Sequence, residues 1–301
     1  MTFDEDALAR LNQHLDKLRT HGSKLGPALK KPLLLLHLLA EVYKQHPANP
    51  INRFTYDEVK APLTALIREY GGRGSAPKPE QPFYHLSSSD LWNLQSDHGF
   101  EYGMSKTATV RELSHPSTFG SFDEGLFQEL VLNRDLCLVA IDSILERWWP
   151  STLHVELKHQ LGVADVVYVS RTSVVRKRDA AFREATLKNY REKCAACGLD
   201  LLFLGSPAGV DACHIHWHAH GGQDSVENGI ALCKFHHWAL DKGIFTVRPD
   251  DHRMAVSPHA LARCSVGQSM ISSLDGRPIS RSDIPPDERF LEWHRANIFR
   301  S

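Results

Sequence analysis

The sequence predicts an α+β protein with two domains: a mainly helical domain over residues 1–160, then a linker and a smaller, metal-stapled domain over 161–301. Two observations predict this division. Leucine-rich segments with helical spacing fill the first half, and the second half carries two pairs of metal-ligand residues. A chain of 301 residues, 42% hydrophobic and 24% charged, is long enough for two globular domains.

Helices account for most of the first half. Leucines recur three and four residues apart over Asp4–Thr20, which is typical of an amphipathic helix. Pro32 stands where the first turn of a helix tolerates proline, and the apolar run Leu33–Gln45 after it indicates a buried helix. We further expect a helix over Phe54–Tyr70, a short strand over Leu91–Leu94, two helical stretches between Leu126 and Trp149, a basic helix over Arg176–Lys193 and a closing helix over Pro286–Ile298.

Glycine and proline interrupt this pattern in the segment 71–86, GGRGSAPKPEQPFYHL. Such a composition predicts an exposed loop rather than regular structure. The loop bears Arg73, Lys78, Phe83 and Tyr84, and it is either a plain connector or a surface that touches a ligand.

Four residues of the second half have the spacing of zinc ligands. Cys194 and Cys197 form a CAAC pair, Cys233 and His236 form a CKFH pair, and 35 residues separate the pairs. Each tight turn directs two ligand atoms inward, which suits a tetrahedral Zn²⁺ ion. A domain this small buries little apolar area, so we expect structural zinc to supply a free energy of order 10 kcal/mol to its folding.

The remaining composition excludes several classes of protein. No apolar run is long enough to span a bilayer, and the acidic start MTFDEDALAR is not a signal peptide. Cys137, Cys213 and Cys264 show no pairing pattern, which favours a reducing compartment. We therefore expect a cytoplasmic protein that does not bind membranes.

A net charge of −1 does not by itself indicate a nucleic-acid partner, but the charge is unevenly distributed. Residues 171–193 carry eight lysines and arginines against three acidic residues. This run is either a solvated helix face or a surface that contacts DNA phosphates.

Three residues around the zinc pairs carry a second pattern. Asn228 follows His214 by 14 residues, and His237 follows Asn228 by nine. With Gly221-Gly222 between them, this spacing resembles that of the HNH endonucleases, whose fold is a zinc-stapled ββα-metal unit. The resemblance covers about residues 189–245. It implies that His214 is the general base, that Asn228 holds the hairpin loop that carries the base, and that His237 binds a catalytic cation.

The resemblance also implies a single catalytic divalent cation, Mg²⁺ or Mn²⁺. On a helix, His237 and Asp241 share one face, a spacing that suits two ligands of one ion. Many family members have a ligand just before the base, where this sequence has Cys213. Either Asp211 therefore reaches the ion, or His237 and Asp241 hold it with waters.

The first half resembles the sulfur-binding domains of phosphorothioate-dependent type IV restriction endonucleases. The motifs KKPLLLLHLL (30–39) and PFYHLSSSDLW (82–92) carry the resemblance. A plain helical dimerisation or substrate-positioning domain is the alternative. The complete fold expected is a mainly helical DNA-reader domain followed by a zinc-stapled ββα-metal (HNH) nuclease domain.

A phosphorothioate carries a sulfur that is larger and less hydrated than oxygen, so its reader needs a small apolar pocket and cations for the flanking phosphates. The candidates for this site are Pro27, Ala28 and Pro32 as pocket walls, Lys31, Arg73 and His85 as charges, and Gly74 and Ser75 as backbone donors. The alternative is that the prolines only shape turns and His85 is a surface histidine.

Together these resemblances imply an endonuclease that recognises phosphorothioated double-stranded DNA and hydrolyses it nearby with a one-metal HNH mechanism, as in restriction. Two alternatives stay open: an HNH nuclease for methylated or unmodified DNA, and a non-catalytic zinc-fold DNA-binding protein. Because an HNH domain has one nuclease centre, cutting both strands calls for two copies or two binding events, and a homodimer is expected.

Overall fold

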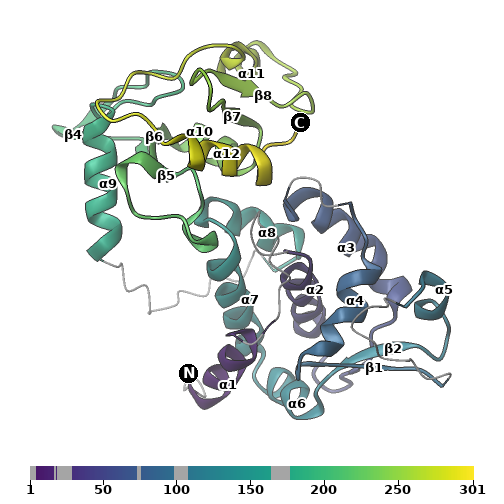
Figure 1. Ribbon diagram of the computed structural model, residues 1–301. Coiled ribbons are helices and arrows are strands. Elements are labelled where there is room, and N and C mark those ends of the chain that lie inside the picture. The colour runs from purple at the N-terminus through teal and green to yellow at the C-terminus, as the bar shows by residue number, and fades with distance from the viewer. Residues whose placement is uncertain (1–4, 17, 19–28, 73–75, 98–107, 164–176) are drawn as a thin grey trace. The chain divides into compact units, whose positions relative to one another are not determined.

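The computed structural model describes residues 5–16, 18, 29–72, 76–97, 108–163 and 177–301, which form two compact units (Figure 1). The first unit comprises residues 1–148 and 154–170, and the second comprises 149–153 and 171–301. The segment Trp149–Leu153 thus belongs to the second unit, although the chain on both sides of it belongs to the first. Helices combine with small antiparallel two-stranded sheets, so the predicted α+β class is confirmed.

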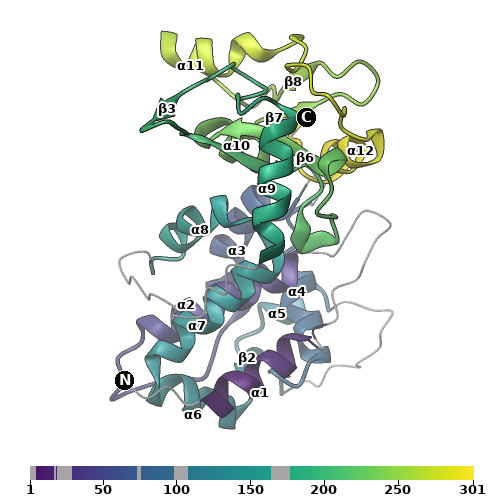
Figure 2. The same ribbon diagram turned by 90° about the vertical axis from the view of Figure 1, so that its left-hand side faces the viewer.

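The first unit is mainly helical. Helices α2 (Lys30–Lys44) and α7 (Arg134–Trp148) lie side by side, and α3 (Tyr56–Tyr70) also contacts α2 (Figures 1 and 2). Ten of the 15 residues of α2 are buried, as its apolar sequence predicts. The other elements are α1 (Glu5–Asp16), α4 (Glu80–His85), η1 (Leu86–Ser88), β1 (Trp92–Gln95), α5 (Val110–Leu113), β2 (Phe119–Phe122), α6 (Glu124–Leu132) and α8 (His154–Gln160).

A capping box sets the start of α3. The side chain of Thr55 accepts a hydrogen bond from the backbone N–H of Glu58, and the Glu58 carboxylate accepts one from Thr55 N at 2.9 Å. These bonds satisfy N–H groups that a helix start leaves unpaired. The helix therefore begins two residues after Phe54, whose backbone pairs instead with Gly120 beside β2.

The prediction of an exposed loop over 71–86 is wrong for its second half. Residues Glu80–His85 form α4, in which Phe83 and Tyr84 are buried. Proline does not prevent this helix because Pro82 lies in its first turn, where no intrahelical N–H bond is required. The ring of Phe83 packs edge-on against Trp92, with centroids 5.7 Å apart. Burial of these aromatic rings outweighs the local composition.

The second unit contains a ββα arrangement. Strands β5 (Val210–His214) and β6 (Gly229–Cys233) pair antiparallel, with His214 opposite Gly229, and α10 (Lys234–Asp241) follows at once. Helix α9 (Lys177–Asn189) contacts both strands. The remaining elements are η2 (Ser151–Leu153), β3 (Leu202–Phe203), β4 (Ser206–Pro207), η3 (His218–His220), η4 (Val226–Asn228), β7 (Phe245–Val247), β8 (Met254–Val256), α11 (Ser265–Met270), η5 (Ser272–Leu274) and α12 (Glu288–Asn297).

A histidine of α12 is part of the core of this unit. His294 is 1% exposed, its Nδ1 lies 2.8 Å from Thr246 Oγ1, and its Nε2 lies 3.0 Å from the carbonyl oxygen of Leu240. A neutral ring that donates from Nε2 and accepts at Nδ1 satisfies both contacts. Burial lowers the pKa of His294 to about 4. Its role is to pack α12 against β7 and α10.

In the described part of the chain, every helix is too short or too polar to cross a membrane.

Candidate active site and metal centres

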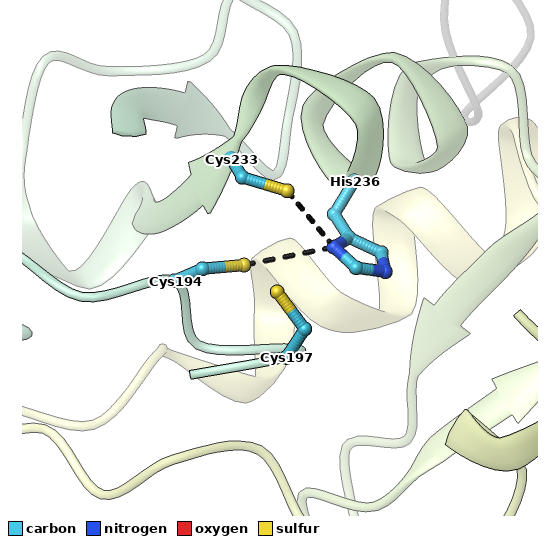
Figure 3. A group of neighbouring side chains, drawn as sticks. All are labelled: Cys194, Cys197, Cys233 and His236. Carbon is cyan, nitrogen blue, oxygen red and sulfur yellow. Dashed lines mark hydrogen bonds between the residues drawn. The ribbon is translucent and has the colours of Figure 1, made fainter. Parts of the chain in front are cut away.

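Cys194, Cys197, Cys233 and His236 converge on one point (Figure 3). The two cysteines of the first pair lie in the turns after α9, Cys233 ends β6, and His236 lies in the first turn of α10. Their ligand atoms all lie within 4.8 Å of one another. We name these four residues the Cys3His group, and they could hold a metal ion.

The distances in the Cys3His group fit a tetrahedral ion. His236 Nδ1 lies 3.1 Å from Cys233 Sγ and 3.7 Å from Cys194 Sγ. Zn–S bonds of 2.3 Å and Zn–N bonds of 2.0–2.1 Å give an S–N edge of about 3.5 Å. The other ring nitrogen of His236, Nε2, lies 2.8 Å from the carbonyl oxygen of Met270. Such a partner fixes the tautomer that leaves Nδ1 for a cation.

The thiols of the Cys3His group influence each other's pKa. The pKa of Cys194 is lowered because Cys194 accepts a hydrogen bond from the Cys233 thiol, and the same bond raises the pKa of Cys233. A thiolate is the form of cysteine that binds metals, and the lowered pKa of Cys194 favours that form.

Asn228 closes the loop between β5 and β6. Its side chain is fully buried; Nδ2 donates to the carbonyl oxygens of His216 at 3.0 Å and Gln223 at 2.9 Å, and Oδ1 accepts from His216 N at 2.8 Å. The two ends of the loop are thus held by three bonds to one amide. His214, which precedes the loop, is thereby held in a fixed position.

Glycine is required at two positions of the loop. Gly221 has a φ of 90°, in the left-handed region that favours glycine. A Cβ atom on Gly222 would lie 1.8 Å from the carbonyl oxygen of His216. The loop could not close on Asn228 with larger residues at these positions.

His214 lies at the end of β5 with its ring stacked on that of Phe182, at a centroid distance of 3.9 Å and an interplanar angle of 12°. Its Nε2 lies 2.9 Å from Asp224 Oδ1, and the side chain is 21% exposed. The stacking and the contact with Asp224 restrict the orientation of the ring. A histidine held in this way can accept and release a proton.

A second group of metal-ligand atoms includes Cys213, the residue just before this histidine. Cys213, His237 and Asp241 have ligand atoms within 4.8 Å of one another, and we name them the Cys-His-Asp group. His237 Nε2 lies 3.4 Å from Asp241 Oδ2, and Cys213 Sγ lies 3.9 Å from Asp241 Oδ1. The group could hold one cation with a nitrogen, an oxygen and a sulfur ligand.

Asp241 is nearly inaccessible, with 3% of its surface exposed. Burial raises its pKa, although His237, Thr152 and Trp217 oppose this effect. Trp217 Nε1 donates to Oδ1 at 3.1 Å, and Thr152 Oγ1 donates to Oδ2. A bound cation would favour the charged carboxylate further.

The structure does not bring Asp211 into the Cys-His-Asp group. Its Oδ1 lies 2.8 Å from Arg183 Nε, and its Oδ2 lies 2.7 Å from Lys234 Nζ. Burial acts to raise the pKa of Asp211, but the hydrogen bond and charge of Lys234 outweigh it, so the pKa is lowered. Cys213, and not Asp211, contributes the third ligand atom of this group.

Acidic residues partly neutralise the basic run 171–193. Arg183 pairs with Asp211, Lys193 Nζ lies 2.8 Å from Asp200 Oδ2, and Arg191 lies 3.7 Å from Asp283. All three basic side chains are at least half exposed. Such exposed pairs are weak, so these cations can still exchange their partners for phosphates.

The three other histidines of the loop differ in their surroundings. His216 stacks on Trp293 with ring centroids 4.0 Å apart, and burial lowers its pKa. His218 is 55% exposed at the side chain, and its Nε2 lies 4.0 Å from Asp224 Oδ1. His220 contacts the rings of Trp217 and Trp293. His218 is the most solvent-accessible of these side chains beside His214.

In the first unit, three of the predicted sulfur-site residues are described. Lys31 Nζ donates to Ser88 Oγ at 3.1 Å, and Ser88 Oγ donates to the carbonyl oxygen of His85 at 2.8 Å. The start of α2 and the end of α4 are therefore adjacent, and Pro32 is buried beside Lys31. The other candidates, Pro27, Ala28, Arg73, Gly74 and Ser75, lie outside the described residues.

Sequence reasoning missed three side chains around these groups. Asp224 pairs with His214, and Thr152 and Trp217 hold Asp241. An acidic residue in the glycine-containing loop was a signal for Asp224. No local pattern marks Thr152, because it lies 89 residues from its partner.

Comparison with solved structures gives neighbours of low similarity. The sulfur binding domain of SprMcrA complexed with phosphorothioated DNA has 19% identity and a TM-score of 0.45, covering 55% of this chain and 99% of that chain. The sulfur binding domain of ScoMcrA complexed with phosphorothioated DNA has 18% identity and a TM-score of 0.42, and the match covers 50% of this chain and 94% of that chain. A modification dependent TagI restriction endonuclease has 20% identity and a TM-score of 0.32, and the match covers 41% of this chain and 39% of that chain. A search of curated proteins gives no match.

Two protein families match the chain directly. Residues 194–248 match a family described as HNH endonuclease, a range that includes β5, β6, α10 and both groups of metal-ligand residues. Residues 8–166, more than half of the 301, match the family described as ScoMcrA-like, DNA sulfur-binding domain. The chain therefore belongs to the ScoMcrA-like DNA sulfur-binding domain family, and it carries an HNH endonuclease domain after that domain.

Proposed function

We propose that this protein is a modification-dependent DNA endonuclease that recognises phosphorothioated double-stranded DNA through residues 1–160 and hydrolyses phosphodiester bonds nearby through residues 161–301. The observation that carries the proposal is the presence of both domains in one chain, a DNA sulfur-binding domain at 8–166 and an HNH endonuclease domain at 194–248. A reader that only signalled modification would not need a nuclease domain. Such an enzyme would act in restriction, on DNA in the cytoplasm.

In the reader, Lys31 and His85 are proposed to approach the modified strand. Lys31 is joined through Ser88 to the backbone carbonyl oxygen of His85, so a phosphate that meets the ammonium group would lie near the residue that carries the imidazole. Pro27, Ala28 and Pro32 remain the proposed walls of the sulfur pocket, with Arg73 as a further charge and Gly74 and Ser75 as backbone donors. A pocket of this kind excludes water from the sulfur, which is weakly hydrated.

In the nuclease, His214 is the proposed general base. A water that attacks phosphorus must lose a proton, and a histidine ring stacked on Phe182 and paired with Asp224 is positioned to take it. Asn228 is proposed to keep the loop after His214 closed, as its three hydrogen bonds indicate. His237 is proposed as a ligand of the catalytic ion.

The Cys-His-Asp group fits a divalent cation. Two ligands of one ion with bonds of about 2.1 Å lie about 3.0–3.4 Å apart, and His237 Nε2 and Asp241 Oδ2 lie 3.4 Å apart. When bound, the cation would stabilise negative charge on the leaving oxygen. Mg²⁺ or Mn²⁺ is proposed, held by His237, Asp241 and water, and Cys213 adds a sulfur that favours softer ions.

The Cys3His group is proposed to hold structural Zn²⁺. Its donor set and distances fit that ion. The contact of His236 Nε2 with the carbonyl oxygen of Met270 is typical of a zinc-bound histidine. The ion would join the turns after α9 to β6 and α10. It would thus hold together the elements that carry the nuclease residues.

Cleavage of one duplex in three forms tests the function. The duplex is prepared with a phosphorothioate, with 5-methylcytosine and without modification, and each is incubated with the full chain, Zn²⁺ and Mg²⁺ or Mn²⁺. We expect cutting of the phosphorothioate form only. Equal cutting of all three forms would refute sulfur recognition, and preferential cutting of the methylated form would support the methyl-dependent alternative.

The non-catalytic alternative is tested by His214→Ala. This variant should bind the phosphorothioate duplex as the parent does and should not cut it. Undiminished cleavage would remove His214 as the base.

The proposed homodimer is tested by size-exclusion chromatography with light scattering, with and without DNA. A homodimer is favoured because each subunit has one nuclease centre and cutting both strands calls for two.

A further inference from the structure

The segment Trp149–Leu153 places a hydroxyl on the Cys-His-Asp group. Its last three residues form η2, which contacts α10. The segment belongs to the second unit, whereas α7 before it and α8 after it belong to the first. Thr152 Oγ1 donates a hydrogen bond to Asp241 Oδ2. The carboxylate of the proposed nuclease centre therefore depends on a residue far outside the HNH match at 194–248.

The oxygen that Thr152 contacts is the one that faces His237. Asp241 Oδ2 lies 3.4 Å from His237 Nε2, a separation that two ligands of one ion have. The other oxygen, Oδ1, accepts from Trp217 Nε1 at 3.1 Å. An ion shared by Asp241 and His237 would thus bind Oδ2, which keeps a lone pair for it beside the hydrogen bond from Thr152.

Burial makes these two donors decisive. The side chain of Asp241 is 2% exposed, so water does not compete for its oxygens. Thr152 on Oδ2 and Trp217 on Oδ1 fix the plane of the carboxylate, and among the described residues Thr152 is the hydrogen-bond donor to the oxygen that turns toward His237. Removal of an orienting partner of a metal-binding carboxylate typically weakens metal affinity about 10- to 100-fold.

We propose that Thr152 is a positioning residue of the nuclease metal site, where it orients the Asp241 carboxylate toward an ion held together with His237. The proposal rests on the proposed function, because it takes the Cys-His-Asp group as the nuclease centre. It extends that centre to the segment between α7 and α8, so the metal affinity of the nuclease depends on a residue within the range of the sulfur-binding domain match.

Mn²⁺ binding to the zinc-saturated full chain tests the proposal. The free Mn²⁺ signal in electron paramagnetic resonance gives the number of bound ions and their Kd, and Mn²⁺ does not compete well for a cysteine-rich zinc site. Thr152→Val replaces the hydroxyl by a methyl group of similar size, and its Kd for Mn²⁺ should rise about 10- to 100-fold. The Mn²⁺ concentration for half-maximal cleavage should rise by the same factor, while binding of the phosphorothioate duplex in the absence of Mn²⁺ is unchanged.

A second pair of variants isolates the hydroxyl. Thr152→Ser and Thr152→Ala both lack the methyl group and differ by one oxygen atom. The serine variant should bind Mn²⁺ nearly as the parent does, and the alanine variant should bind as weakly as the valine variant. Ser151→Ala, at an exposed neighbouring position, is the matched control and should leave the Kd unchanged.

The outcomes separate this proposal from the proposed function. If the parent binds one Mn²⁺ ion and the valine and alanine variants bind it equally tightly, the role of Thr152 is refuted and the metal site stands. Equal weakening in the serine and alanine variants would also refute it, because the hydroxyl would then make no contribution. A parent protein that binds no Mn²⁺ would overturn the metal site and the role of Thr152 together.

Discussion

Replacing Asn228 by alanine should open the loop that follows the proposed base. The substitution removes three hydrogen bonds of 2.8 to 3.0 Å from a fully buried side chain. At about 1 kcal/mol net for each bond, the closed loop loses about 3 kcal/mol. This free energy corresponds to an increase of about 100-fold in the population of the open loop. Because a small displacement of a reacting group lowers the rate about 100-fold, cleavage should fall by at least that factor.

Hydrogen exchange of the zinc-loaded full chain measures the opening. The amides of His220 and Gly222, which both donate to the carbonyl oxygen of Trp217, report on the closed loop and should lose about 100-fold of their protection. Gln223→Ala is the control, because it alters an exposed side chain and keeps the backbone carbonyl that Asn228 uses. Unchanged protection of these two amides in Asn228→Ala would refute the reasoning.

Three further predictions concern the metals and the pH. Removal of zinc with a chelator should abolish the cooperative unfolding of the second unit, and a circular-dichroism melt that is unchanged afterwards would contradict a structural role for the Cys3His group. Cys213→Asp replaces sulfur by oxygen among the ligands of the Cys-His-Asp group, so the Mg²⁺ concentration for half-maximal cleavage should fall, whereas Cys264→Asp at an exposed position should not change it. The pKa of His294 is about 4 in the folded protein and about 6.5 in the unfolded chain, so the unfolded chain binds more protons between these values. Stability should fall as the pH drops from about 6.5 toward 4, by at most about 1.4 kcal/mol per pH unit, and His294→Gln should flatten this slope in urea titrations of the zinc-loaded protein.

Local patterns were sufficient for most of the fold. The leucine-rich run after Pro32 forms α2, and the strand expected near Leu91 is β1. Both follow from the composition and spacing of residues close in sequence. The segment that contains Phe83 was wrongly predicted as an exposed loop, because its helix depends on packing against Trp92 and Tyr56. Burial in the folded protein outweighs a composition rich in proline.

Part of the candidate site could be proposed from the sequence. Spacing predicts His214, Asn228 and His237 as site residues because the HNH resemblance sets the distances between them along the chain. The contacts of Asp224 with His214 and of Thr152 with Asp241 were not predictable, since they form only in the folded structure. Asp211 was expected at the ion, but Arg183 and Lys234 hold both of its oxygens, and no pattern along the chain indicates such competition.

The position of Trp149–Leu153 limits how this protein could exchange domains in evolution or in the laboratory. In a chimera joined at residue 160, the segment Trp149–Leu153 would be replaced together with the reader. The nuclease would then have the residue that the new reader carries at the position of Thr152, with or without a hydroxyl. Grafting the HNH range 194–248 alone onto another reader would have the same defect. Functional fusions should therefore carry a copy of these five residues, and natural recombinants of this architecture should preserve a hydroxyl at the position of Thr152.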